Sequence, residues 1–291
     1  MSFPGWWLEM AHAASSHERL RQFRELILAE TGIRLPPSKD SMIAARLRKR
    51  LIALDLPTLD AYFEHIFDGG ALSDELTPII ELVTTNKTDF FREPAHYAFL
   101  ANRIIPEAVA RTRPGQTTRF RFWSAASSTG AEAWSAAMVL ARAAPKHKAF
   151  DWRILGTDIS PRVLDKARHA IFPEADFAPV PADLREAYVM SARMNGQSVG
   201  RIVPELRAQV KFEALNLIEP PFPLEGGIDV AFLRNVLIYF EAPTQAQVIR
   251  SVSEHVRPGG YLVVGHAESM IVRLPGFKAC APGVYRKEEM H

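Results

Sequence analysis

One short segment, residues 85–93, concentrates side chains that can bind a ligand. It runs Thr85-Asn86-Lys87-Thr88-Asp89-Phe90-Phe91-Arg92-Glu93 and combines small hydrogen-bonding groups, paired aromatics and an Arg–Glu pair. Asn, Thr and Phe have low helix propensity, so a segment that only had to be a stable helix would avoid them. The planar guanidinium of Arg92 matches the geometry of a carboxylate, which makes it a candidate ligand for one. Two alternatives stay open on these residues alone: a capped turn between helices, and a structural pair of Arg92 with Glu93 or another acid.

A second candidate site is the loop Ser124-Ala125-Ala126-Ser127-Ser128-Thr129-Gly130, which follows a predicted strand. Its residues are small, but a single glycine does not make the glycine-rich loop that cradles a pyrophosphate. Close approach of the backbone without a phosphate clamp suits the amino-acid end of S-adenosylmethionine better than NAD. The alternative is a tight strand–helix turn with a purely structural purpose.

A third candidate is Asp158, which ends the predicted strand Arg153–Thr157. A carboxylate at the end of the second strand of such a sheet can accept hydrogen bonds from both hydroxyls of a ribose. Asp158 could instead cap the helix that opens at Pro161. Ser160 can serve as that cap, which would leave Asp158 for the ligand, and we favour the ligand.

The first part of the chain is predicted to be helical. Residues 1–15 are expected to be a flexible N-terminus and residues 16–84 a helical domain, followed by the ligand-binding segment and a linker helix in residues 85–115. The break at Arg113-Pro114-Gly115 marks the boundary. Helical periodicity predicts helices at Leu20–Glu30 (ending before Gly32), after Ser38 or Asp40, at Ala61–Phe67, at Leu76–Val83 and at Ala95–Arg111.

The rest of the chain, residues 116–291, alternates strands and helices, which is typical of a doubly wound, Rossmann-like α/β sheet. The predicted strands are Arg119–Ser124, Arg153–Thr157, Val210–Ala214, Ile228–Leu233 and Tyr261–Val264, and the predicted helices include Glu132–Ala144 and Thr244–Val256. Residues from about 171 to 207 fit no strand–helix unit, so they are predicted to be a small inserted β-subdomain. Within it, 201–204 could form an edge strand, although Pro204 would end its pairing.

Composition indicates a globular enzyme in a reducing compartment. The apolar fraction of 47% is enough for a core, and a net charge of +2 does not suggest nucleic-acid binding. Cys280 is the single cysteine, which rules out a disulfide framework and a cysteine-rich zinc site. No apolar run approaches the ~20 residues of a membrane span, and no signal peptide is visible. We therefore expect a cytoplasmic, monomeric protein without membrane insertion and without a metal.

Several blocks of the chain closely resemble, in order, motifs of the chemotaxis-receptor glutamate methyltransferases of the CheR type. Residues 85–93 resemble TNxTxFFRE, and the loop at 124–130 resembles the start of CAAxSTGEEPYS. The later blocks are 155–168 (ATDIS…VLxxAR), 215–217 (LNL), 234–240 (RNVLIYF, identical) and 258–269 (PGGYL…GHSES). The chain departs from the family's GEEPY at Gly130-Ala131-Glu132-Ala133-Trp134, where the second Glu is kept as Glu132.

The resemblance implies S-adenosylmethionine as cofactor and S-adenosylhomocysteine as product. It implies that Arg92 and Tyr239 point into the methyl-transfer pocket as catalytic residues; on burial habit alone, Tyr239 could be a core residue. His266 is expected to be a loop histidine with satisfied hydrogen bonds rather than a catalyst. The cofactor-binding residues assigned on this basis are Asn86, Thr88, Arg92, Glu132, Asp158, Asn216, Leu217, Arg234 and Asn235.

A basic arc on the second predicted helix is a candidate docking surface. Arg46, Lys49 and Arg50 fall beside an apolar stripe of that helix. The resemblance implies an acceptor rich in acidic residues, the helical cytoplasmic domain of a chemoreceptor, which such an arc could guide. The alternative is a solvated basic face without a partner.

The function predicted from the sequence is S-adenosylmethionine-dependent methylation of glutamate carboxylates on bacterial chemoreceptors during adaptation. Two alternatives remain: a methyltransferase for a different protein acceptor, and a non-catalytic scaffold or cofactor sensor of the same fold. The replacements at Ala131 and Trp134 keep the second alternative open. The inserted subdomain is expected to contribute to receptor contact, and binding of a receptor tail is left open.

Overall fold

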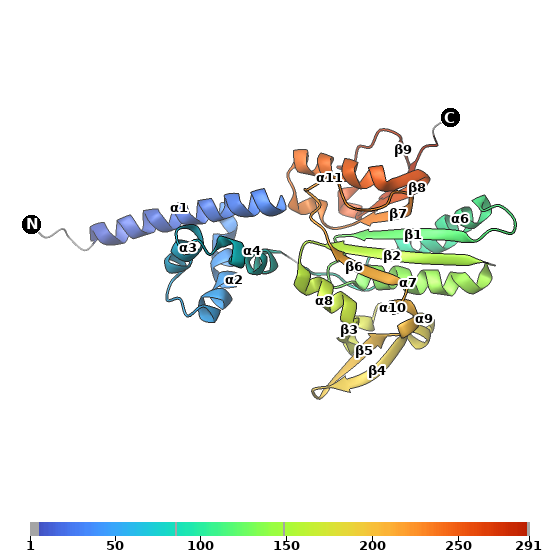
Figure 1. Ribbon diagram of the computed structural model, residues 1–291, viewed down its shortest axis with the longest axis horizontal. Helices are drawn as coiled ribbons and strands as arrows, with labels where there is room; N and C mark the ends of the chain where they lie inside the picture. Colours follow the sequence, from blue (N-terminus) through green and yellow to red (C-terminus); the bar gives the residue numbers. More distant parts are fainter. Residues whose placement is uncertain (1–5, 85, 148, 290–291) are drawn as a thin grey trace, which may run out of the picture. The chain divides into compact units, whose positions relative to one another are not determined.

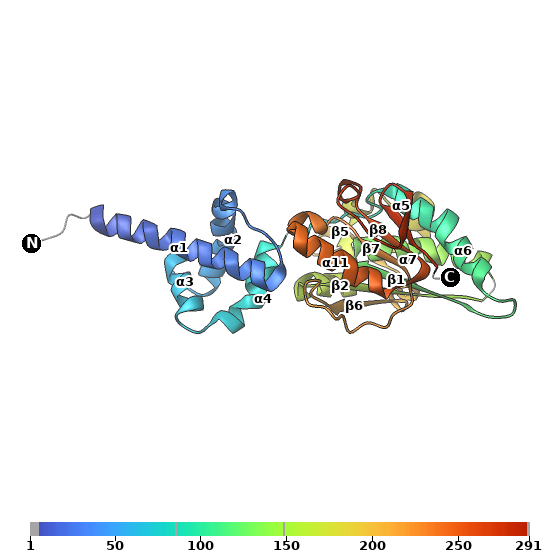
Figure 2. The same ribbon diagram turned by 90° about the horizontal axis from the view of Figure 1, so that it is seen from above.

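The computed structural model describes residues 6–84, 86–147 and 149–289, with side chains described from residue 17 onward. The chain folds into two compact units (Figures 1 and 2). One holds residues 6–84 together with Tyr239–Glu241, and the other holds Asn86–Ile238 and residues 242–289. The segment predicted as a linker therefore belongs to the second unit from Asn86 onward. Thr85 lies outside the described residues.

The first unit is helical. Its elements are α1 (Trp6–Thr31), a 3-10 turn (Pro37–Lys39), α2 (Asp40–Ala53), α3 (Leu59–Phe67) and α4 (Leu72–Val83). Residues 1–5 lie outside the described residues, and α1 begins at Trp6, within the segment 1–15 whose flexibility stays a prediction. The stretch from Trp7 to Ala14 is rich in Leu, Glu, Met and Ala, which all favour a helix.

An ion pair is buried within the helical unit. Arg50 on α2 donates to both carboxylate oxygens of Glu75 on α4, at 2.6 and 2.5 Å, and Tyr62 on α3 donates to Glu75 at 3.1 Å. Glu75 is 3% exposed, so the charge of Arg50 and the hydroxyl of Tyr62 compensate a carboxylate removed from water. The apolar core around these helices consists of Phe23, Ile27, Ile43, Leu47, Tyr62, Phe63, Ile66, Ile79 and Val83.

The second unit is built on a seven-stranded sheet with the order β6-β2-β1-β7-β8-β10-β9. Strands β6, β2, β1, β7 and β8 run parallel, and β10 is antiparallel to both β8 and β9. The chain leaves β1 towards β2 and later returns to β7 on its other side, so the strand order reverses between β1 and β7. Ligands of open α/β sheets bind at the carboxyl ends of the strands beside such a reversal.

The strands are β1 (Thr118–Ala125), β2 (Phe150–Asp158), β6 (Val210–Ala214), β7 (Ile228–Leu233), β8 (Val256–Val264), β9 (Phe277–Ala281) and β10 (Val284–Lys287). The helices are α7 (Ala131–Ala143), α8 (Pro161–His169), α10 (Pro204–Arg207) and α11 (Ala242–His255), with 3-10 turns at Ala144–Lys146, Leu237–Tyr239 and His266–Glu268. The predicted doubly wound sheet is confirmed, and the bounds predicted for β6 and β7 are those observed. The sequence prediction omitted the antiparallel pair β9–β10.

The helix that follows the signature segment (residues 85–93) packs into this unit. It consists of α5 (Pro94–Phe99), a π-helical turn (Leu100–Ile104) and α6 (Ile105–Arg111). Tyr97, Leu100 and Ile104 join the same core as Phe122 and Phe232 of the sheet. A π-helical turn of this kind inserts one extra residue into a helix and is frequent near functional sites.

A small antiparallel sheet is inserted between α8 and β6, as predicted. It has the order β3-β5-β4, with β3 (Ile171–Pro173), β4 (Val189–Met194) and β5 (Gln197–Ile202), and it carries a 3-10 turn (Glu174–Phe177) and α9 (Ala182–Tyr188). β5 is the middle strand, so the expectation of an edge strand at 201–204 was wrong. The reason is that β5 pairs with β3 on one side and with β4 on the other.

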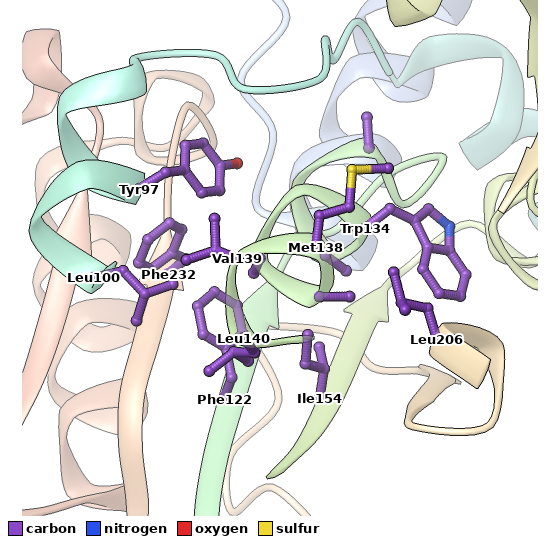
Figure 3. Close-up of a cluster of buried hydrophobic side chains, with 14 of the residues drawn as sticks. Tyr97, Leu100, Phe122, Trp134, Met138, Val139, Leu140, Ile154, Leu206 and Phe232 are labelled. Atoms are coloured by element: carbon purple, nitrogen blue, oxygen red, sulfur yellow. The ribbon is translucent and has the colours of Figure 1, made fainter. Parts of the chain in front are cut away.

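Trp134, one of the departures from the family pattern, is a core residue. Its indole is 1% exposed and its ring centroid lies 5.4 Å from that of Phe212. Figure 3 shows the indole beside Met138 and Leu206, on the side of α7 away from Tyr97. Gly130 lets α7 start this close, because a Cβ there would lie 2.9 Å from Ala167 and 3.0 Å from the Trp134 nitrogen.

Candidate functional site

The loop after β1 has a strained backbone that neighbouring groups hold in place. Ala126 and Ser128 have φ angles of 62° and 52°, a left-handed conformation that side chains other than glycine rarely adopt. The Ser127 amide donates to the Thr157 carbonyl at 2.7 Å, and the Ser128 amide donates to the Asp158 carboxylate at 2.8 Å. Such strain persists only where the surroundings enforce it, and it gathers at ligand sites.

Asp158 is the centre of this arrangement. One of its carboxylate oxygens accepts from Ser128, and the other accepts from the Ser160 amide at 3.0 Å. The side chain is 7% exposed, and burial raises the pKa of its carboxyl group, while the backbone amides oppose that shift. Each oxygen retains a lone pair that these bonds do not use, so Asp158 can still accept from a ligand.

The expected division of roles between Asp158 and Ser160 was wrong in one respect. Ser160 is the residue before α8, but its side chain makes no capping hydrogen bond. Within the described residues its buried hydroxyl has no partner, and neither has that of Ser127. Asp158 itself accepts the Ser160 amide, so it combines a structural role at the helix start with any role towards a ligand.

The signature segment lies against the same loop. The Ser128 hydroxyl donates to the Asn86 carbonyl at 2.8 Å, which brings two predicted cofactor residues, Asn86 and Asp158, to opposite sides of Ser128. The amide of Leu215 donates to the Asp158 carbonyl at 3.0 Å, which places Asn216 and Leu217 beside the end of β2. Asn216 is half-buried and donates to Glu219 at 2.7 Å, while Leu217 is buried.

Arg234, at the end of β7, connects the signature segment to α7. Its guanidinium donates to Glu132 at 3.0 Å, to Glu93 at 3.2 Å and to the Arg92 carbonyl at 2.5 Å. The Arg234 side chain is 1% exposed and lies over the rings of Tyr97 and Phe232. The guanidinium thus holds three segments together, and its predicted role in cofactor binding stays a prediction.

Both carboxylate oxygens of Glu132 accept hydrogen bonds from neighbouring side chains. One carboxylate oxygen accepts from the Ser124 hydroxyl at 2.7 Å and the other from Arg234. Burial raises the pKa of Glu132, against the lowering effect of the Arg234 charge. The role of Glu132 towards the cofactor stays a prediction.

Arg92 accepts a hydrogen bond from Arg234 through its carbonyl, but its guanidinium takes no part in these ion pairs. Its side chain is half-buried, and within the described residues its guanidinium has no hydrogen-bond or ion-pair partner. The alternative of an Arg92–Glu93 pair is wrong, because Glu93 pairs with Arg234 instead. Phe91 and Glu93, on either side of Arg92, have φ angles of 51° and 56°, so this segment is strained as well. Thr88 is half-buried, also without a side-chain hydrogen bond in the described part of the chain.

Glu268 is a site-forming residue that the sequence reasoning did not single out. It is 0% exposed, and its carboxylate accepts from the amides of Asn235, Leu237 and Gly265, each at 2.8 Å. These bonds hold the loop after β7, where Asn235 has a φ of 59°. The signal in the sequence was the GHSES-like block that contains Glu268.

Tyr239 and the basic arc belong to the helical unit. The Tyr239 carbonyl accepts from the Arg34 amide at 3.1 Å, and Phe240 forms a β-bridge with Ile33.

Arg46 donates to the carbonyls of Leu82 and Val83 at 3.0 and 2.7 Å, and these bonds cap the carboxyl end of α4. Arg46 and Arg50 are therefore engaged in folding contacts, while Lys49 is exposed. The docking roles of all three, and the catalytic role of Tyr239, stay predictions.

The donor set of the α/β unit fits S-adenosylmethionine. Asp158 presents a buried carboxylate that suits ribose hydroxyls. Arg92 presents a guanidinium, without a partner in the described part of the chain, that suits the methionyl carboxylate. The loop at 124–130 offers small side chains and backbone but no glycine-rich pyrophosphate cradle, in agreement with a ligand that carries no phosphate.

Comparisons with known proteins agree with this fold and show the family of the chain. Residues 86–282 match the family described as CheR methyltransferase, SAM binding domain, and residues 18–84 match the CheR methyltransferase all-alpha domain. The chain is 35% identical over 258 residues to chemotaxis protein methyltransferase 2 of Pseudomonas aeruginosa, covering 88% of each chain. It is 33% identical over 245 residues to a probable chemotaxis protein methyltransferase of Rhizobium etli (84% of this chain, 89% of the relative). It is 34% identical over 259 residues to the chemotaxis protein methyltransferase of Salmonella typhimurium (88% of this chain, 85% of the relative).

No helix in the described ranges is long and apolar enough to cross a bilayer.

Proposed function

Because this chain belongs to the CheR methyltransferase family, we propose that it transfers the methyl group of S-adenosylmethionine to glutamate carboxylates of bacterial chemoreceptors. The names of its relatives, all chemotaxis protein methyltransferases, support a receptor as acceptor. The products are a glutamate methyl ester and S-adenosylhomocysteine. The proposal includes the acceptor atom, which is a carboxylate oxygen of a glutamate side chain.

One observation carries the proposal: the backbone of Arg92 is held beside the loop at 124–130, while its guanidinium has no partner among the described residues. The Arg92 carbonyl is bound by Arg234, and the start of its segment is bound through Asn86 to Ser128. Ser128 in turn is bound by Asp158. An anion beside a ribose bound at Asp158 would give this half-buried cation a partner, which supports the assignment.

The reaction requires positioning rather than acid–base chemistry. A glutamate side chain has a pKa of about 4.3 and is ionised near neutral pH, so it is already a nucleophile and needs no general base. The bound cofactor supplies a methyl group on a positively charged sulfur. The displacement neutralises the two opposite charges, so a dry pocket with fixed alignment favours it.

The residues divide into ligand-contacting and positioning groups. We assign Asp158 to the ribose hydroxyls, Arg92 to the methionyl carboxylate or the acceptor carboxylate, and Tyr239 to the orientation of the acceptor. Asn86, Thr88, Asn216, Leu217 and Asn235 line the cofactor. Arg234 and Glu132 act mainly as positioning residues, because the two terminal nitrogens of Arg234 and both carboxylate oxygens of Glu132 already bind other protein groups.

The test is methylation of receptor-containing membranes from the protein's own organism with S-adenosylmethionine carrying a labelled methyl group. Base-labile label on the receptor, released as methanol, is the expected result, and an Arg92→Ala protein serves as the negative control. Base-stable label would show a different acceptor chemistry. Saturable cofactor binding without any transfer to these receptors would favour the scaffold alternative.

A further inference from the structure

Each of the two ring nitrogens of His96 faces an oxygen atom, but a neutral imidazole carries only one N–H. The ring is 2% exposed, and its Nε2 lies 3.2 Å from the Pro282 carbonyl oxygen. A carbonyl oxygen only accepts, so Nε2 must carry the proton. Its other nitrogen, Nδ1, lies 3.3 Å from a carboxylate oxygen of Glu93, and it has no hydrogen-bond partner in the part of the chain that the structure describes. In a neutral ring, the lone pair of Nδ1 then faces a Glu93 oxygen that also accepts from Arg234 and from the His266 amide.

His266 brings a third ligand group to the same gap. The candidate ligand atoms of Glu93, His96 and His266 all lie within 4.8 Å of one another. The rings of His96 and His266 are in edge contact, with centroids 4.8 Å apart, and the His266 amide already donates to the Glu93 carboxylate. His266 is exposed, so its ring can turn without disturbing the core.

We propose that Glu93, His96 and His266 form a binding site for a divalent transition metal, with Zn²⁺ as its best-fitting ion. Tetrahedral zinc at roughly 2.0–2.2 Å from nitrogen and oxygen ligands holds those ligands about 3.3–3.5 Å apart. The separation of Glu93 and His96 already has this value. Two histidines and one glutamate, with the fourth position open, are a known zinc donor set.

The surroundings support the site in two ways. Metal-bound histidines usually donate their second ring N–H to a carbonyl or carboxylate, and the Pro282 carbonyl fills that place for His96. Gly283 allows this approach, because a Cβ there would lie 3.2 Å from Nε2 of His96 and 2.5 Å from the Val264 carbonyl. Both histidines also line a cavity of about 400 Å³, which gives an ion a route to the site.

This site is distinct from the proposed methyl-transfer pocket, since none of its ligands was assigned to the cofactor. The two are nonetheless linked, because Glu93 follows Arg92 in the chain and pairs with Arg234 at 3.2 Å. The proposal replaces the expectation, drawn from the sequence, that the protein carries no metal site and that His266 is only a loop residue.

The test is titration of the untagged, chelator-treated full chain with Zn²⁺, followed by calorimetry. We expect one Zn²⁺ per chain, with binding weakened at least tenfold in His266→Ala and in Glu93→Gln. His169→Ala is the matched control, because His169 is an exposed histidine on α8 and should leave the affinity unchanged. Equal Zn²⁺ affinity in the unmodified protein and in both ligand variants would overturn the proposal.

Co²⁺ provides a second readout that does not depend on stability or activity. The unmodified chain loaded with Co²⁺ should show the intense visible absorption of a four-coordinate nitrogen–oxygen site, and His266→Ala should lose it. His266 is exposed, so this variant should keep its circular dichroism and melting temperature in the absence of metal. Weak absorption typical of six-coordinate aqueous Co²⁺ in the unmodified chain would contradict the site.

Discussion

Arg234 and Glu132 form a buried ion pair, 3.0 Å between nitrogen and oxygen, that connects the end of β7 to the start of α7. Because the same guanidinium also holds Glu93 and the Arg92 carbonyl, the ion pair fixes the signature segment over the carboxyl ends of the strands. In the proposed cofactor site, Arg234 and Glu132 therefore bind other protein groups, while Arg92 and Asp158 are the residues that we assign to the ligand.

Asp158→Ala should weaken the binding of S-adenosylhomocysteine by at least 1–2 kcal/mol, the usual loss when hydrogen bonds to a bound ligand are removed. The melting temperature should fall too, because the Ser128 and Ser160 amides lose their acceptor. Calorimetry at a temperature where the variant is folded checks the affinity. Asp165→Ala, an exposed acid on α8, is the control. An unchanged affinity in Asp158→Ala would disprove the ribose assignment.

Arg92→Lys and Arg234→Lys should separate ligand binding from folding. Arg92→Lys breaks no side-chain contact of the described residues, so it should keep the melting temperature while it lowers turnover. Arg234→Lys loses the fork that joins three segments, and it should cost at least about 2 kcal/mol of unfolding free energy. Thermal melts and methylation rates of both variants measure this. Equal destabilisation of the two would argue against the division of roles.

Tyr239→Phe removes one hydroxyl and should lower kcat while the cofactor affinity stays within a few-fold of the unmodified protein. This pattern is expected if Tyr239 orients the acceptor or the methyl group. Single-turnover methylation and calorimetry measure the two quantities separately. Normal turnover in Tyr239→Phe would remove the residue from the proposed pocket.

Arg50→Ala and Lys49→Ala should behave differently although they are neighbours on α2. Arg50→Ala leaves Glu75 buried without its cation and should cost about 2 kcal/mol or more. Lys49→Ala should leave stability unchanged, because Lys49 is exposed. If the basic arc guides an acidic receptor, Lys49→Ala should raise the receptor KM at low salt, and the effect should fade as salt shortens the screening length. If the receptor KM is the same in the unmodified protein and in Lys49→Ala at every salt concentration, Lys49 has no role in docking.

Stability should depend on pH through His96. Burial, and next the charge of Arg234, lower the pKa of His96 to about 4 from its ordinary 6.5. His96 therefore binds a proton below about pH 6.5 in the unfolded chain, but only below about pH 4 in the folded chain. The stability from this group is complete above pH 6.5 and is lost as pH falls through that window, by about 3 kcal/mol.

Urea unfolding of the chelator-treated protein between pH 4 and 7.5 measures this loss, and the difference from His96→Gln isolates it from other groups. The slope of stability against pH should be steeper in the unmodified protein than in the variant. Parallel profiles would show that His96 titrates at the same pH in both states.

The sheet was predictable because its signals are local. The strand Ile228–Leu233 is buried along its whole length and apolar at every position except Asp229, and Asp158 is the last residue of β2. The pairing of charged side chains was not predictable in this way. Helical spacing placed Arg46 and Arg50 on one face of α2, but only the folded unit shows that this face meets α4. Likewise, Glu93 and His266 lie far apart in the sequence and meet through the packing of the loops after β8.

The inserted sheet leaves and re-enters the α/β unit at neighbouring points, since the Ile202 amide donates to the Ala170 carbonyl at 3.1 Å. Residues 171–201 therefore form a closed excursion whose two ends are already tied together. The excursion is anchored to the rest of the unit, because Phe172 and Phe177 share its core and pack against Phe90 of the signature segment. A displacement of the inserted sheet would therefore be transmitted through Phe90 to the neighbouring Phe91 and Arg92.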